Sequence, residues 1–119
     1  MSFFALTQTS DILQHTTVST NTTLDNSYYI IGCNASSGTI TLTLPASSST
    51  PNGKIYYIKD ENGNLGEYVI NIKAPSGTNL DGVNGDTITL GTSYSGMALY
   101  NDTSFGWLII YYYTPSGGG

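Results

Sequence analysis

Residues 53–66 have the sequence GKIYYIKDENGNLG, and the interpretation of the whole chain starts from this stretch. An apolar run at 55–58 enters a polar turn that contains Asn62-Gly63, and residues 68–73 follow as a second extended run. Asn-Gly between two extended runs is the strongest short-range signal for a β-hairpin, because both central residues of a tight turn need positive φ. The sequence therefore predicts a hairpin here, with further strands laid against it.

Short apolar segments separated by Gly, Pro and Asn recur along the rest of the chain, and no window shows the 3.6-residue period of a helix. Strands are predicted at 27–33, 38–44, 54–59, 67–73, 86–90, 95–100 and 106–113, with a weaker one at 16–20. The fold class is therefore all-β. We expect an antiparallel β-sandwich of the jelly-roll type, or a trimeric β-prism-like module, with about seven or eight short strands.

The domain division follows the same pattern. Residues 1–26 are rich in Thr, Ser and Asn and are predicted to form an N-terminal arm, residues 27–113 the β-domain, and residues 114–119 a flexible Gly-rich tail. Within the arm, Phe3-Phe4-Ala5-Leu6 either docks on a neighbour or packs locally as a chain end. The N-terminus has no basic region and only a four-residue apolar stretch, so no signal peptide is expected.

Composition limits the possible partners. Charged residues make up 9 % of the chain, against roughly 25 % in ordinary soluble domains, and the formal net charge is −5. Three scattered lysines cannot form the basic patch that nucleic acid or an anionic membrane requires. Cys33 is the single cysteine, which excludes an intramolecular disulfide, and its apolar neighbours predict a buried thiol. No cofactor is expected.

Several strands are apolar on both sides. In 106–113, for example, Trp107, Ile109, Tyr111 and Tyr113 alternate with other apolar residues. One sandwich core covers only one of these sides, so the second side predicts self-association, unless tyrosine hydroxyls make it tolerable to water. The residues expected at a subunit interface are Tyr29, Ile31, Tyr56, Ile58, Trp107, Ile109 and Tyr111.

No catalytic constellation is found, and the chain is not expected to be an enzyme. The one histidine, His15, has no nucleophile elbow to accompany it. Asp60 and Glu61 are better explained as residues of a solvated turn than as paired catalytic carboxylates. The 60–64 turn also departs from the spacing of an EF-type calcium loop, so a turn without metal is favoured. Exposed tyrosines such as Tyr94 and Tyr113 remain candidates for glycan stacking.

Several motifs occur together in a recognisable order. They are GTITLTLPA at 38–46, GKIYYIKDENGNLG at 53–66, YVINI at 68–72, LDG at 80–82, TITL at 87–90 and LYNDTSFGWLII at 99–110. This order resembles a module of tail-fibre, tailspike and other virion surface proteins of phages and large DNA viruses. The chain departs from the pattern in the extra aromatic residue Phe105 and in the aromatic run at 111–113.

The resemblance implies a β-rich, usually trimeric module on a particle surface, without enzymatic activity. We therefore expect a virion structural protein, either a fibre or spike component or a capsid-decoration protein, made in the host cytoplasm. It would associate with itself, would contact other virion proteins through residues 1–26, and could touch a host-surface glycan. The alternative is a carbohydrate-binding module or lectin. The oligomeric state separates the two hypotheses.

Overall fold

The computed structural model describes residues 12–116 and confirms the all-β class. Within these residues there is no α-helix, and eleven strands form two sheets. The large sheet has the order β1 (His15–Val18), β3 (Ile30–Cys33), β5 (Ile55–Asp60), β10 (Gly96–Asp102), β11 (Gly106–Tyr113), β7 (Asn79–Leu80) and β8 (Val83–Asn84). The small sheet has the order β2 (Thr22–Thr23), β4 (Ile40–Thr43), β6 (Ile70–Lys73) and β9 (Thr87–Leu90). One 3₁₀ turn, η2 (Ser47–Ser49), precedes β5.

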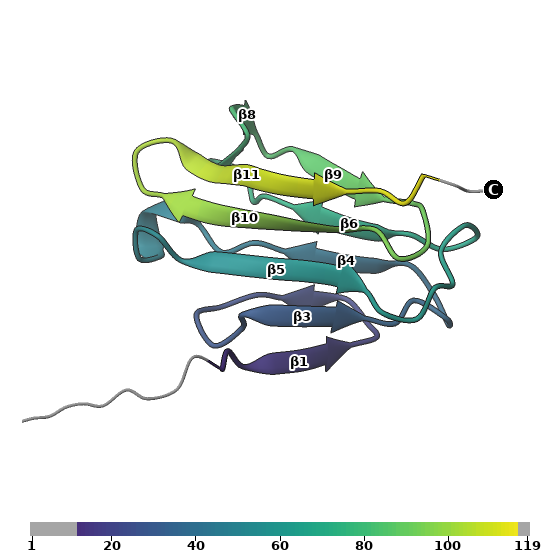
Figure 1. Ribbon diagram of the computed structural model, residues 1–119. Helices are drawn as coiled ribbons and strands as arrows, with labels where there is room; N and C mark the ends of the chain where they lie inside the picture. The colour runs from purple at the N-terminus through teal and green to yellow at the C-terminus, as the bar shows by residue number, and fades with distance from the viewer. Residues whose placement is uncertain (1–11, 117–119) are drawn as a thin grey trace, which may run out of the picture.

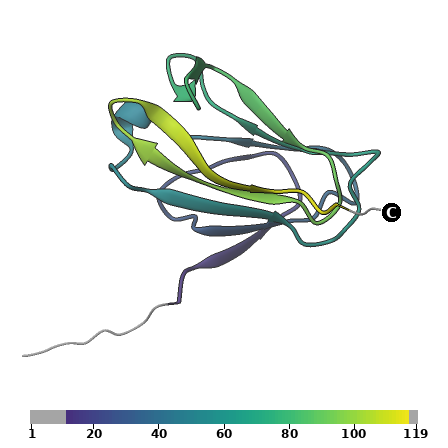
Figure 2. The same cartoon turned by 45° about the horizontal axis from the view of Figure 1, so that its top comes forward.

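The chain winds between the two sheets (Figures 1 and 2). From β1 to β6, odd-numbered strands join the large sheet and even-numbered strands join the small sheet. Successive strands within each sheet are parallel in this region, since each return passes through the other sheet. The second half closes both sheets with antiparallel strands: β10 pairs with β5 and β11, and β9 pairs with β6. The sheets are thus mixed. The sequence had predicted antiparallel sheets, and the parallel pairs in the first half correct that prediction.

The predicted hairpin over residues 54–73 is wrong. β5 and β6 lie in different sheets, and β5 pairs instead with β3 and β10. The turn has only part of the expected backbone, since Gly63 has φ 73° but Asn62 does not have a positive φ. Its N–H groups, however, bond to the Asp60 carboxylate, and the chain then crosses to the small sheet. The crossing lets the apolar sides of both strands face one shared core.

Alternation within each strand builds that core. The inward residues of β4 and β6, such as Leu42 and Ile72, are fully buried, while the threonines between the β4 residues are partly exposed. On the large sheet, the rings of Tyr56 and Trp107 stack with centroids 5.1 Å apart. Each ring also meets its polar requirement, because the Trp107 indole N–H donates to the Pro45 carbonyl at 3.0 Å and the Tyr56 hydroxyl donates to a backbone carbonyl at 2.8 Å.

Four residues that were expected at a subunit interface belong to this core. They are at most 2 % exposed in the single chain: Ile31, Tyr56, Ile58 and Trp107. Each one points toward the small sheet, so it packs inside its own chain and offers no surface to a second one. Strands that are apolar on both sides do exist. The prediction assigned these four residues to the outer side of their strands, whereas they lie on the inner side.

The predicted N-terminal arm is also corrected. Within the described part of 1–26, residues 15–18 and 22–23 are strands of the two sheets, and Val18 and Leu24 are buried. This part therefore belongs to the β-domain. Residues 1–11, including the Phe3–Leu6 run, lie outside the described residues, as does part of the predicted tail at 117–119.

Parallel pairing of β4 with β6 can be tested by a disulfide. Thr41 and Asn71 are direct neighbours on the outer face of the small sheet. Neighbouring strands are about 4.8 Å apart, within the roughly 4.4–6.8 Å that a disulfide spans between Cα atoms. The double variant Thr41→Cys with Asn71→Cys should therefore oxidise readily to an intrachain bridge, measured as a mass loss of two hydrogens.

The control pair is Thr41→Cys with Thr89→Cys. Thr89 lies opposite Asn71 on the next strand, so these two positions are two strands apart and should not close. Equal oxidation of both pairs, or of neither pair, would contradict the pairing.

Candidate functional site

A β-bulge in β11 decides which side chains reach the outer face of the large sheet. Leu99 of β10 lies opposite Ile109, but the preceding residue of β10, Ala98, lies opposite Tyr111 and not Ile110. Ile110 is therefore the extra residue of the bulge. Because side chains alternate along a strand, one extra residue exchanges the two sides for everything that follows it.

The bulge separates residues that the sequence placed on one side. Trp107 is buried and Ile109 packs against the core, whereas Tyr111 and Tyr113 point to the outer face and are 58 % and 43 % exposed. Of the seven expected interface residues, Tyr111 is thus the one that stands well exposed on the outer face. No pattern in the sequence marks Ile110 as a bulge, so sequence reasoning missed this exchange.

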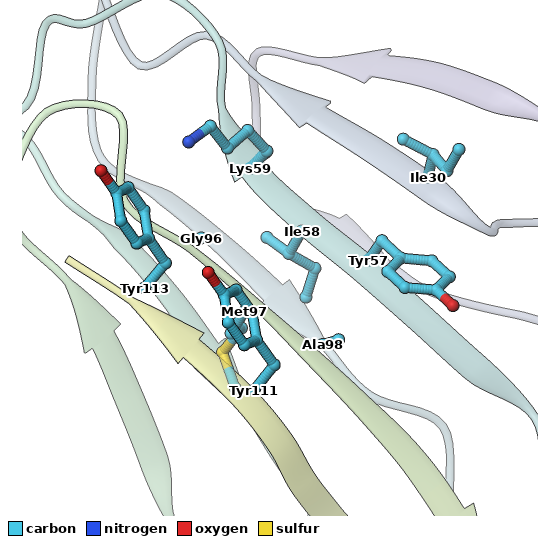
Figure 3. A pocket seen from close by; sticks show the side chains of 9 residues that line it. All are labelled: Ile30, Tyr57, Ile58, Lys59, Gly96, Met97, Ala98, Tyr111 and Tyr113. Carbon is cyan, nitrogen blue, oxygen red and sulfur yellow. The ribbon is translucent and has the colours of Figure 1, made fainter. Parts of the chain in front are cut away.

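An apolar groove of about 220 Å³ crosses the outer face (Figure 3). Two cross-strand rows form most of it. One row runs through Ile30, Tyr57, Ala98 and Tyr111, and the other through Lys59, Gly96 and Tyr113. Ile58 and Met97 complete the lining.

The groove exists because β10 carries small residues where it forms the floor. A Cβ on Gly96 would lie 2.7 Å from the Ile58 carbonyl oxygen, so this position does not accept a side chain. Ala98 is only 4 % exposed although it faces outward, since larger side chains stand on both sides of it. Tyrosines of β5 and β11 therefore form two walls over a shallow floor.

Lys59 is the charged residue of the groove lining. Its ammonium group donates a hydrogen bond to the Tyr94 carbonyl and lies 5.0 Å from the centroid of the Tyr113 ring. The two residues predicted as glycan contacts are thus connected through one cation. They do not share a surface, however, because the lining of the groove includes Tyr113 and not Tyr94.

The buried carboxylate of Asp60 holds the loops next to this end of the groove. Asp60 is fully buried, and its oxygens accept backbone N–H groups from Asn62 and Gly63, and from Tyr94 at 2.7 Å. Tyr94 has φ 65°, and its ring fills the space where a Cβ on Gly63 would lie. Asp60 therefore binds loop amides at this position. Over residues 12–116, no group of three or more His, Cys, Asp or Glu side chains could hold a metal ion.

His15 belongs to the strand framework, which the sequence did not reveal. It begins β1, and its Nε2 atom lies 2.9 Å from an oxygen of Glu61. The Glu61 carboxylate covers Gly32 of β3, where a Cβ would lie 2.1 Å from one of its oxygens. Both partners are about half exposed, so this pair contributes little to stability. The pair joins the start of β1 to the turn that follows β5, while the backbone ladder between β1 and β3 holds the first strand in place.

Lys54 is a second lysine, besides Lys59, whose ammonium group is held by backbone carbonyls and an aromatic ring. The sequence did not reveal this arrangement. Lys54 is buried, and its ammonium group donates to the carbonyls of Asn26 and Tyr28 and lies 3.3 Å from the centroid of the Tyr29 ring. Burial lowers the pKa of Lys54, and the negative charge of Asp25 partly offsets this shift. Tyr29, another expected interface residue, is therefore half-buried beside a structural lysine that fastens the segment before β3.

The comparisons with known proteins do not identify the chain. No protein-family model matches it, and no curated protein matches it either. Among residues 12–116, no helix is long and apolar enough to span a membrane. The candidate site combines an aromatic groove with the exposed end of β11.

The Asp60 network predicts a specific loss of stability. Asp60→Asn keeps the shape but directs an amide toward backbone N–H groups and removes the charge from these hydrogen bonds. We expect the free energy of unfolding to fall by about 1–3 kcal/mol, measured by urea denaturation. The matched control is Glu67→Gln, an exposed carboxylate in the same crossover segment, which should stay within about 0.5 kcal/mol of the wild type. Equal effects of the two variants would refute the role of Asp60.

Cys33 is buried as predicted, and burial, with smaller contributions from Asp60 and Glu61, raises the pKa of its thiol to about 12. At pH 8, roughly one thiol in 10⁴ is then ionised, against about a quarter in an unfolded chain. Labelling by a disulfide reagent at pH 8 should therefore be at least about 100-fold slower in the native protein than in guanidinium chloride. Rapid labelling of the native protein would show that the strand carrying Cys33 opens to solvent.

Proposed function

We propose that this chain is a virion structural protein, a non-enzymatic fibre, spike or capsid-decoration component that associates with itself on the surface of a virus particle. Two observations support the proposal. The motif order resembles viral surface modules, and the C-terminal half of β11 presents an uncovered strand edge. The second observation carries the proposal, because it does not depend on the resemblance.

The edge begins where β7 stops protecting β11. β7 pairs with β11 at Trp107 alone, and the Asp81 carboxylate accepts the Ile109 N–H at 3.1 Å. Beyond that point, no strand of the described chain pairs with this side of β11. The side chains there are large, uncharged and at least 43 % exposed: Ile110, Tyr111, Tyr112 and Tyr113.

Such an edge pairs readily with another strand. Proteins that remain monomeric usually interrupt an exposed edge with Lys or Pro, or keep it very short. A β-bulge is another such device, and β11 has one at Ile110. The residues beyond it, 111–113, contain neither Lys nor Pro, and Pro115 follows only after the strand has ended. A second copy of the chain can cover this apolar end of β11, so self-association removes it from water.

The resemblance favours three copies, arranged around a common axis so that each β11 contacts a neighbour. A closed ring of this kind is heterologous, so each β11 edge contacts a different surface of the next copy and no open end is left for further growth. It would also correspond to the trimeric prism expected from the sequence.

Glycan binding is the second candidate, and a different surface favours it. At the other end of β11, a polar hollow of about 140 Å³ is lined by hydroxyl and amide groups from residues such as Ser47, Thr78 and Asn79. Phe105 borders it and is 66 % exposed. Hydrogen-bonding groups beside an aromatic face suit a sugar better than the apolar tyrosine groove does. This hollow could serve a host contact or an independent lectin.

Self-association through β11 can be tested by charge insertion. The double variant Ile110→Lys with Tyr112→Lys places two ammonium groups on the edge, where pairing would bury them. We expect wild-type protein to sediment as a trimer, and the variant to dissociate with an association at least about 100-fold weaker, or about 2.7 kcal/mol. Analytical ultracentrifugation over a concentration series measures this.

The matched control is Leu13→Lys, an exposed apolar residue just before β1, which is the strand at the opposite edge of the large sheet, and this variant should leave the trimer intact. Unchanged circular dichroism of all variants excludes unfolding as the cause. A wild-type chain that remains monomeric at high concentration would refute the self-association. If that monomer were retained on immobilised polysaccharide, the lectin candidate would replace it.

A further inference from the structure

The tyrosine-walled groove is an uncovered apolar surface on the outer face of the large sheet, and it is distinct from the backbone edge of β11 described above. Its lining is aliphatic and aromatic except for Lys59, whose ammonium group is already bonded to the Tyr94 carbonyl. In Figure 3, Tyr57 stands on one side and Tyr111 and Tyr113 on the other. An occupant that needs many hydrogen bonds finds few partners there, so the groove fits an apolar side chain best.

Its size suits one aromatic ring. The groove holds about 220 Å³, and a protein cavity of about 150 Å³ accommodates benzene. Aromatic rings also pack favourably in stacked or edge-on contact with other rings, which the tyrosine walls provide. A phenylalanine ring is thus a suitable occupant in both volume and chemistry.

The register of the large sheet brings the start of the described chain close to this groove. His15 of β1 lies opposite Ile30, Ile30 opposite Tyr57, and Tyr57 opposite Ala98. One cross-strand row therefore connects the first strand to the groove floor. Three strand spacings of about 4.8 Å place His15 about 14 Å from Ala98.

The residues that precede β1 contain an apolar run of matching character. Phe3-Phe4-Ala5-Leu6 is followed by eight residues before His15. Residues 12–14 have described positions, so the segment starts from Ile12. An extended chain covers roughly 3.3 Å per residue, which places Ile12 within about 10 Å of His15 and lets Phe4 lie up to about 26 Å from Ile12. Phe4 therefore reaches the groove, which is at most about 24 Å from Ile12, with a nearly extended chain.

We propose that the groove on the outer face of the large sheet binds the Phe3–Leu6 segment of the same chain, with one phenylalanine ring between Tyr57 and the tyrosines of β11. The segment crosses β1, β3 and β5 to reach this position. Docking covers the groove but not the unpaired backbone edge of β11, so it is compatible with self-association and does not require it.

The test uses the full-length chain with a photoreactive benzoyl-phenylalanine in place of Phe4. Irradiation at low micromolar concentration, followed by peptide mass spectrometry, should give cross-links to groove residues, chiefly Tyr57 and Tyr111. The control places the same group at Thr9, outside the apolar run, and should give at most a tenth of that yield at the groove. Cross-links from Phe4 that avoid the groove overturn the proposal.

A mixture of isotopically heavy and light chains separates binding within one chain from binding between chains. Cross-links that join only heavy to heavy or light to light peptides support the intramolecular arrangement. Mixed cross-links overturn it and assign the segment to a neighbouring copy. The experiment is repeated in the Ile110→Lys, Tyr112→Lys background, where cross-linking should persist even if the proposed oligomer is absent, so the two proposals fail independently.

A second measurement needs no photochemistry. In the double variant Phe3→Ser with Phe4→Ser, the groove loses its occupant while every described strand is unchanged. Nitration of Tyr57 by tetranitromethane should then become at least threefold faster than in the wild type, whereas nitration of Tyr94, outside the groove, should keep its rate. An unchanged rate at Tyr57 overturns the proposal, and so does an equal acceleration at Tyr94.

Discussion

The two sheets share one core, and that core covers only one face of each strand. This constraint explains why the chain alternates between sheets: β5 and β6 each have an inward apolar face, and crossing the core lets both faces be buried together. It also leaves the outer face of the large sheet without a cover. Tyrosines gather on this outer face because the sequence has more apolar surface than the core of one chain can bury.

Polar groups guide the winding as much as apolar ones. The Asp60 carboxylate collects N–H groups from its own turn and from Tyr94, and Lys54 collects carbonyls from the segment before β3. Both charges are buried and both act on loops that connect the sheets. A buried charge is stable only when its hydrogen bonds are satisfied, so these two residues fix where the chain may cross.

Sequence reasoning found the strands but not their partners. Alternation of apolar and polar residues is a local signal, and it located the strands at 40–43 and 87–90 within a few residues, while a continuous apolar run located the strand at 106–113. Pairing is non-local, so Asn62-Gly63 suggested a hairpin although the turn serves a crossing. The two-residue strands β2, β7 and β8 are too short to show any period. The site was predicted only in part, because Tyr111 and Tyr113 were recognised as functional candidates while the bulge that turns them outward has no sequence signature.

The bulge at Ile110 divides β11 into a buried part that packs in the core and an exposed part that does not. Before it, Trp107 and Ile109 must satisfy the shape of the core, so their replacement disturbs folding. After it, Tyr111 and Tyr113 stand on the outer face and line the groove, so the core constrains them less. A lineage could therefore revise the last residues of this strand rapidly, changing the partner it recognises while inheriting the same scaffold. A strand of eight residues with one part in the core and one part exposed would suit a binding surface whose partner changes during evolution.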